Sequence, residues 1–157
     1  MSSQALGLFR RYGRSAPGRW LVSRLVCLRA PYFGSIAPTI DALEPGRCVV
    51  RIRDRRRVRN HIGTVHAIAL CNMAELAGGL ATDATIPDGM RWIPKGMTVR
   101  YLKKAKGTML ATARVPAIEV AASGSEVHAI IEVRDAADEV VFDADITMWI
   151  APRKQEQ

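Results

Sequence analysis

Residues 60–81 read NHIGTVHAIALCNMAELAGGLA, and this stretch decides the fold of the 157-residue chain. A polar loop leads into a run in which small or apolar residues fall on every side of a helix. The sixteen residues from His66 to Ala81 would span about 24 Å as a helix. Thr64 is the expected N-cap. We therefore predict a long helix that is buried all round, covered by a curled sheet or by a second subunit.

Alternating apolar residues predict strands before and after this helix. One strand is expected over 48–53, after a turn at 44–46, and residues 36–43 are expected to pair with it. Later strands are expected over 97–103, 109–115, 127–133 and 140–150, with turns at Gly107, Gly124 and 135–138. The fold class implied is α+β, an antiparallel sheet laid around one long helix.

The first 31 residues are expected to form an N-terminal helical extension. Short helices are predicted over 4–13 and 18–29, where Leu21, Leu25 and Leu28 form a stripe expected to pack on a surface. A cationic cap on the domain is favoured over a membrane-surface anchor. The Arg-rich, acid-free start also fits a transit peptide, but its prolines and apolar residues favour a folded segment.

Composition limits the class of protein. A hydrophobic content of 48% excludes wholesale disorder. Three cysteines without a CxxC pair indicate neither a disulfide framework nor a zinc site, so we expect a reducing, cytoplasmic compartment. The apolar run at 20–28 is too short to span a bilayer and is interrupted by Ser23 and Arg24.

The net charge of +8 is unevenly distributed. Residues 1–60 hold 13 Arg and three acids, a net of +10, whereas residues 61–157 hold 10 bases and 12 acids, a net of −2. The basic run at 51–59 makes a nucleic-acid binder one hypothesis, although no stacking platform of aromatic residues is evident. Weak, salt-sensitive binding to any polyanion is expected from the charge alone.

Glu75 is the only acid between residues 55 and 82. A carboxylate in such apolar sequence must have a partner, a raised pKa or access to a cleft, which favours a functional residue over a solvated helix edge. The backbone amides of His66 and Ala67 at the helix start could cradle a developing oxyanion. His61 and His66 lack metal-ligand spacing, so no metal is expected.

The spacing of His66 and Glu75 predicts a functional dimer. Nine residues along one helix place the two side chains on opposite sides, so one chain does not easily form a site containing both. Two antiparallel copies related by a two-fold axis could bring Glu75 of one chain to the helix start of the other.

Residues 60–75 resemble the loop and central helix of hotdog-fold thioesterases of the phenylacetyl-CoA thioesterase type. Those proteins have Asn or Gln, then Gly, then His-Gly-Gly, and an Asp or Glu nine residues after the His. Residues 101–107, YLKKAKG, also resemble that family's strand and turn. The resemblance covers about residues 32–151 and implies a hotdog domain over 32–152, followed by a tail at 153–157. It is closest to an uncharacterised branch with a similar N-terminal extension.

The resemblance implies an acyl-CoA thioesterase that works as a dimer or a dimer of dimers. Glu75 would be the base or nucleophile and Ala67 the amide donor to the thioester carbonyl. Asn60 would position water or substrate, and His66 would fix the loop. Expected substrate contacts are Gly63, Ile68, Arg59, Lys103, Lys104 and Lys106, the basic ones through the phosphates of coenzyme A. No cofactor is implied beyond the coenzyme A of the substrate.

A second hypothesis stays open beside hydrolysis. Ala67 and Ile68 stand where that family usually has two glycines, and the bulk of Ile68 would narrow the substrate slot. A non-catalytic protein that binds acyl-CoA or lipid is therefore the alternative. Both hypotheses predict acyl-CoA binding, and only the first predicts Glu75-dependent release of free thiol.

Overall fold

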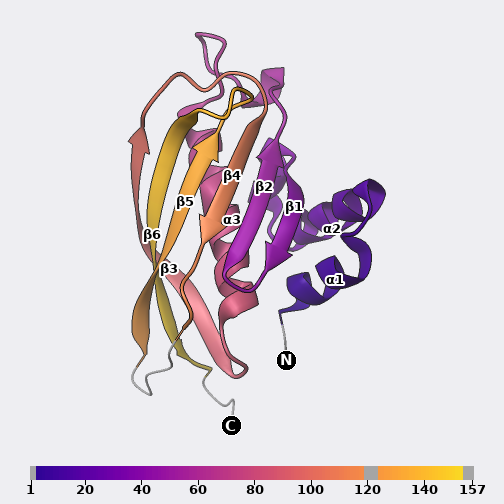
Figure 1. The fold of residues 1–157 in the computed structure, drawn as a ribbon, viewed down its shortest axis with the longest axis vertical. Helices are drawn as coiled ribbons and strands as arrows, with labels where there is room; N and C mark the ends of the chain where they lie inside the picture. Colours follow the sequence, from indigo (N-terminus) through magenta and orange to yellow (C-terminus); the bar gives the residue numbers. More distant parts are fainter. Residues whose placement is uncertain (1–2, 119–123, 154–157) are drawn as a thin grey trace.

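The computed structural model describes residues 3–118 and 124–153 as a curled sheet around one long helix (Figure 1). Three α-helices and two short 3-10 helices accompany six strands in this part of the chain. In order they are α1 Gln4–Tyr12, α2 Ala16–Arg29, η1 Pro31–Ile36, β1 Thr39–Glu44, β2 Arg47–Ile52, η2 Arg56–Val58, α3 Ala67–Thr85, β3 Met90–Tyr101, β4 Met109–Arg114, β5 Ser125–Arg134 and β6 Val140–Pro152.

All neighbouring strands of the sheet are antiparallel, in the order β1-β2-β4-β5-β6-β3. The predicted α+β class and the later strands are confirmed. Strand β3 begins at Met90, whereas the sequence predicted a start at residue 97. The prediction missed the first half of the strand because Pro94 and Gly96 break the alternation of apolar residues. The register with β6 shifts at these residues. Strand β3 ends the sheet, so one of its edges is open in the single chain.

The core lies between the concave face of the sheet and α3. Phe142, Ala144, Ile146, Met148 and Ile150 of β6 are buried, as their alternation predicts. They share one hydrophobic cluster with the residues on the inner face of α3, Met73, Ala77 and Ala81. Burial of these side chains stabilises the domain because it removes apolar surface from water.

Helix α3 confirms the predicted helix and corrects two of its details. The N-cap is His66 and not Thr64, because the His66 ring nitrogen Nδ1 accepts a hydrogen bond from the Ile68 N–H at 3.0 Å. Burial is not complete all round. Ile68 is 53% exposed and Glu75 is also exposed, because the sheet leaves this side of the helix open next to β3.

The N-terminal helices pack beside β1 and α3, as Figure 1 shows. Both predicted helices are confirmed, but the predicted packing stripe is wrong. Leu21 and Leu28 are 41% and 76% exposed. The buried face instead carries Val22, Ser23 and Cys27. Ser23 can be buried there because its hydroxyl accepts a hydrogen bond from the Ile40 N–H of β1 at 2.8 Å.

The predicted division into extension, domain and tail stays a prediction. Of the expected tail, only Arg153 lies within the described residues, and 154–157 lie outside them. Among the helices described, none is long and apolar enough to cross a membrane.

Candidate active site

Glu75 projects from the open side of α3 into a groove at the edge of the sheet. Glu75 is exposed, as a residue at a solvated helix edge would be, and it also lines two hollows of the surface. We use the name edge groove for the outer side of α3 at Ile68, Cys71 and Glu75 together with Met97 and Tyr101 of β3, where Glu75 and Met97 line one hollow and Cys71 contacts Tyr101. Within the described chain, no residue forms a hydrogen bond or salt bridge with the Glu75 carboxylate. An ionised carboxylate without such a partner keeps its oxygen atoms available as acceptors for a bound molecule.

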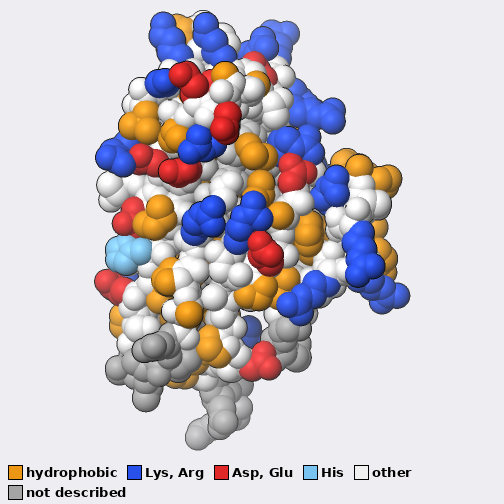
Figure 2. Space-filling view, viewed as in Figure 1, with side chains coloured by type: hydrophobic (Ala, Val, Ile, Leu, Met, Phe, Trp, Pro, Cys, Tyr) orange, Lys and Arg blue, Asp and Glu red, His pale blue; other side chains and the backbone are white. Residues whose placement is uncertain are grey.

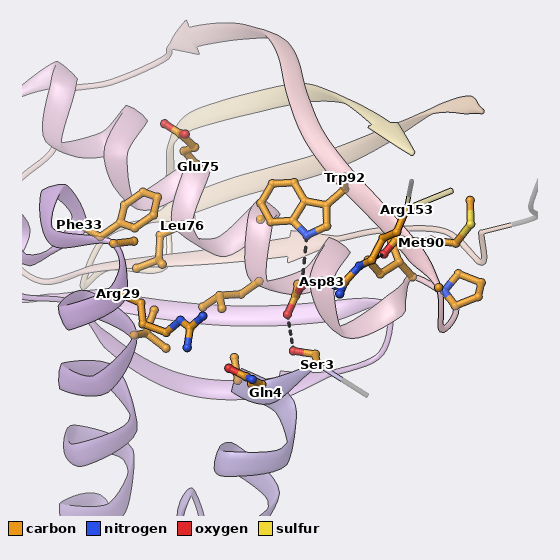
Figure 3. A pocket seen from close by; sticks show the side chains of 18 residues that line it. Ser3, Gln4, Arg29, Phe33, Glu75, Leu76, Asp83, Met90, Trp92 and Arg153 are labelled. Carbon is orange, nitrogen blue, oxygen red and sulfur yellow. Dashed lines mark hydrogen bonds between the residues drawn. The ribbon is translucent and has the colours of Figure 1, made fainter. Parts of the chain in front are cut away.

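Two hollows meet at Glu75. The smaller one, about 250 Å³, lies between Glu75 and the irregular part of β3 at Pro94, Lys95 and Gly96. The larger one, about 650 Å³, extends from Glu75 beneath the N-terminal helices (Figure 3). We call the larger hollow the N-terminal cavity. The carboxylate therefore stands where two compartments of different shape join.

Tyr101 and Cys71 close one side of the edge groove. The Cys71 Sγ and Tyr101 Oη atoms lie 3.2 Å apart. This hydrogen bond, together with burial and the nearby thiol, raises the pKa of Tyr101 to about 12. A tyrosine is protonated at neutral pH even at its ordinary pKa of about 10, so Tyr101 offers a neutral hydroxyl beside Cys71.

The start of α3 presents a free backbone amide at Ala67. The predicted contribution of a free His66 amide is wrong, since the His66 N–H donates to the Val58 carbonyl at 2.7 Å. The Ala67 N–H has no acceptor among the described residues. A free amide at the positive end of the helix dipole is suited to stabilise negative charge on an oxygen atom.

Asn60 lies in the loop before α3, where its side chain holds the turn together. Its Oδ1 accepts from the N–H groups of Ile62 and Thr64, both at 3.1 Å, and its Nδ2 donates to the Thr64 hydroxyl at 2.8 Å. Gly63 supplies a positive φ of 77° in the same turn. One Nδ2 hydrogen of Asn60 remains for another acceptor.

The chain does not bring Ala67 and Glu75 together. Eight residues of helix separate them, which corresponds to about 12 Å along the axis. The two predicted catalytic groups are therefore too far apart to act on one carbonyl group within a single chain.

The basic residues expected to contact phosphates lie at one end of the molecule, where Figure 2 shows Lys and Arg side chains gathered near the top. Two of them have acidic partners: Arg59 Nε lies 2.6 Å from Asp54 Oδ1, and Lys103 Nζ lies 2.8 Å from Glu139 Oε1. Lys104 and Lys106 have no such partner in the described residues. Arg55 and Arg56, on the neighbouring loop, are also exposed.

The residues that build the N-terminal cavity were not predicted from the sequence. Asp83 and Trp92 lie within it, and Arg29 lies at its wall (Figure 3). The available signal was Asp83, a second acid eight residues after Glu75 and four residues after Gly79. Its partner Trp92 lies on β3, whose first half was not predicted because Pro94 and Gly96 interrupt the alternation. No described group of three or more His, Cys, Asp or Glu residues could hold a metal ion.

Known proteins share this fold and much of this sequence. A family model described as "Domain of unknown function (DUF4442)" matches residues 18–150. A solved structure described as genomics APC5556 is 43% identical, with a TM-score of 0.83 over 95% of this chain and 99% of that one. A protein of unknown function from Pseudomonas aeruginosa, described as a probable thioesterase, is 26% identical, with a TM-score of 0.77 over 85% and 95% of the two chains.

A more distant structure shares the fold alone. It is a protein from Streptococcus mutans solved with acetyl CoA bound, at 19% identity and a TM-score of 0.62, covering 74% of this chain and 90% of that one. No curated protein matches the sequence. Several structural neighbours are described as thioesterases or probable thioesterases, and both the resemblance seen in the sequence and the fold class are confirmed.

Proposed function

Because the chain belongs to the DUF4442 family, in the thioesterase-like hotdog superfamily, we propose that it is an acyl-CoA thioesterase. The observation that carries the proposal is the Glu75 carboxylate, exposed in a groove with no partner among the described residues. The free Ala67 amide supplies the second element of the chemistry. A P. aeruginosa relative described as a probable thioesterase supports the reaction class.

The proposed enzyme is a dimer formed through the open edge of β3. Ile93 and Met97 of this strand are 59% and 39% exposed, and Ile68 on α3 is also exposed. Apolar groups gathered at an unpaired strand edge favour pairing with another strand. Pairing of two β3 strands about a two-fold axis would run the α3 helices antiparallel, so that each Glu75 approaches the helix start of the other copy.

The reaction follows from these two groups. Glu75 takes a proton from a water molecule, and the water oxygen adds to the thioester carbonyl carbon. The Ala67 N–H of the other copy stabilises the negative charge on the carbonyl oxygen. When the carbonyl reforms, the carbon–sulfur bond breaks, the thiolate of coenzyme A leaves and takes up a proton, and the free acid remains. Direct attack by Glu75, followed by hydrolysis of the anhydride, yields the same products.

The free cations at the loop end of the molecule fit the phosphates of coenzyme A. Lys104 and Lys106 are exposed, and no described acidic group neutralises them. Arg59 and Lys103 contribute less, because Asp54 and Glu139 already pair with them. The acetyl CoA bound by the S. mutans protein of the same fold supports a coenzyme A substrate.

The test is thiol release from a panel of acyl-CoA substrates, from acetyl-CoA to palmitoyl-CoA and including phenylacetyl-CoA. Glu75→Gln keeps the size of the side chain and removes the base, so we expect kcat/KM to fall by about 10²- to 10⁴-fold. Glu132→Gln, an exposed acid on β5, is the matched control and should stay within twofold of the unchanged protein. Equal activity of the Glu75→Gln and unchanged proteins would refute the catalytic role.

The alternative is a protein that binds acyl-CoA without cleaving it. Ile68, 53% exposed beside the free Ala67 amide, favours it, since the side chain narrows the approach to that amide. Binding of the whole panel without thiol release from any member would establish this alternative. Ile68→Gly would then be expected to introduce measurable release, because it opens the amide to the carbonyl.

A further inference from the structure

The N-terminal cavity is a compartment that the hotdog sheet and helix do not form by themselves. Its walls come from α1, α2, α3 and the start of β3, and Glu75 stands at one end (Figure 3). The cavity volume of about 650 Å³ lies within the range of about 300–1,000 Å³ seen for small-molecule pockets. The N-terminal extension therefore adds a wall to a space that opens onto the candidate catalytic carboxylate.

A specific set of hydrogen bonds holds the extension over this space. The Ser3 hydroxyl donates to Asp83 Oδ2, and the Trp92 Nε1–H donates to Asp83 Oδ1 at 3.2 Å. Ser3 also caps α1 by accepting from the Leu6 N–H at 3.2 Å. One carboxylate on α3 thus joins the first helix of the extension to the strand on the opposite wall, which fixes the width of the cavity.

The packing of Trp92 depends on glycine at position 79. A Cβ atom on Gly79 would lie 2.8 Å from Cη2 of Trp92, closer than side chains tolerate. Without that Cβ, the indole ring lies directly on α3 and forms an apolar wall. The remaining lining is mainly apolar and includes Val26, Phe33, Leu76, Leu80, Ile86 and Met90.

The charged side chains Asp83, Arg29 and Arg153 lie at the wall of the N-terminal cavity and have partners or reach water, so the space between them stays apolar. Asp83 already accepts two hydrogen bonds, and Arg153 donates from Nε to the Met90 carbonyl at 3.1 Å. Arg29 and Arg153 are both exposed, so their guanidinium groups can reach water from the cavity wall. A long uncharged chain is the ligand class that suits such a lining.

We infer that the N-terminal cavity receives the hydrocarbon chain of the substrate, so that the protein selects medium- to long-chain fatty acyl groups. The inference rests on the proposed function and adds to it a substrate class and the part of the chain that sets it. With the thioester carbonyl near Glu75, the chain would extend past Leu76 and Leu80 towards Trp92 and Met90. Each additional methylene buried there should tighten binding about fourfold until the cavity is filled.

The test measures binding apart from hydrolysis. Saturated acyl-CoA molecules with 2 to 16 carbons are titrated into Glu75→Gln protein by calorimetry. We expect Kd to fall steeply from acetyl-CoA to dodecanoyl-CoA and then to level off. A dissociation constant independent of chain length would overturn the inference.

Filling the cavity supplies the structural control. Val26→Trp on α2, made in the Glu75→Gln protein, should weaken dodecanoyl-CoA binding at least tenfold and change acetyl-CoA binding less than twofold. Leu21→Trp on the exposed face of the same helix should change neither. Ala5→Trp fills the cavity from α1 and replaces Val26→Trp if that variant does not fold. Equal effects of the cavity and control variants would overturn the inference.

The two proposals fail in distinguishable ways. If the chain-length dependence is seen but the protein with its natural Glu75 releases no thiol, the cavity binds acyl chains and the catalytic proposal is wrong. If thiol is released equally from all chain lengths and Val26→Trp has no effect, hydrolysis is correct and the assignment of the cavity is wrong.

Discussion

The two faces of α3 are built from similar residues in very different surroundings. The inner face, with Met73, Ala77 and Gly78, is buried against the sheet. The outer face, with Ile68, Cys71 and Glu75, borders a groove that the single chain leaves open. Hydropathy alone does not separate these faces, because a face covered by a second copy needs apolar residues as much as a core does.

The largest effect on folding is expected from the inner face. Met73 is fully buried, so Met73→Ala should leave a cavity and lower the free energy of unfolding by about 2–5 kcal/mol. Glu75→Gln, half a turn away on the outer face, should change it by less than about 0.5 kcal/mol. Urea unfolding of both variants checks this. Similar losses in the two would mean that the faces are not distinct in the way described.

The next largest effect concerns assembly. Ile68→Asp would place a charge in the proposed dimer contact, which should weaken dimerisation at least a hundredfold. Ile130→Asp is the control, because Ile130 is similarly exposed, at 47%, on β5, away from the edge groove. Sedimentation velocity over a range of concentrations would detect the change. Dimers that persist in Ile68→Asp would exclude this contact.

Two adjacent glycines of α3 face different neighbours. A Cβ on Gly79 would meet the rigid indole of Trp92 at 2.8 Å, whereas a Cβ on Gly78 would meet the flexible end of Ile146 at 3.1 Å. Gly79→Ala should therefore cost about 1–3 kcal/mol through overpacking. Gly78→Ala should cost less than about 1 kcal/mol, since the gain in helix propensity offsets the tighter contact. Thermal unfolding would rank the two, and the reverse order would contradict this account of Trp92.

The smallest effect involves the loop that leads to the outer face. Hydrogen bonds from Arg59 and from the Gly107 N–H hold the pKa of Asp54 below its ordinary value. The folded protein therefore prefers the ionised form, and the stabilisation is complete above the unfolded pKa of about 3.9. This stabilisation is lost as the pH falls below the unfolded pKa and passes through the lower pKa that Asp54 has in the folded protein.

Asp54→Asn should accordingly lower the free energy of unfolding at pH 7 by about 1 kcal/mol. It should also reduce the loss of stability between pH 7 and pH 3, which we call the acid limb. Urea unfolding at pH 7 and at pH 3 measures both effects. Asp138→Asn, in an exposed turn, should leave the acid limb unchanged. An unaltered acid limb in Asp54→Asn would show that this ion pair does not tie the loop in solution.

The sequence predicted the elements better than it predicted their exposure. Alternation identified β4, β5 and β6, and the apolar run identified α3, because periodic burial leaves a periodic pattern. The exposed sides of α2 and α3 were misassigned because a single sequence does not reveal which apolar stripe the sheet covers. Glu75 could be identified as a candidate functional residue, because burying a lone carboxylate among apolar residues would cost free energy. The N-terminal cavity could not, because Ser3, Asp83 and Trp92 are distant in the sequence.

The position of β3 has a consequence for the order in which the protein folds. Strand β3 precedes β4 and β5 in the chain, yet its neighbour in the described sheet is β6. Its pairing must wait until β6 has been made and placed, which closes a long loop late in folding. In native-state hydrogen exchange of the single chain, the amides of β3 should therefore open before those of β4 and β5. Pairing with a second copy along the free edge of β3 should delay this opening, so dimerisation would also hold in place the strand that forms one wall beside Glu75.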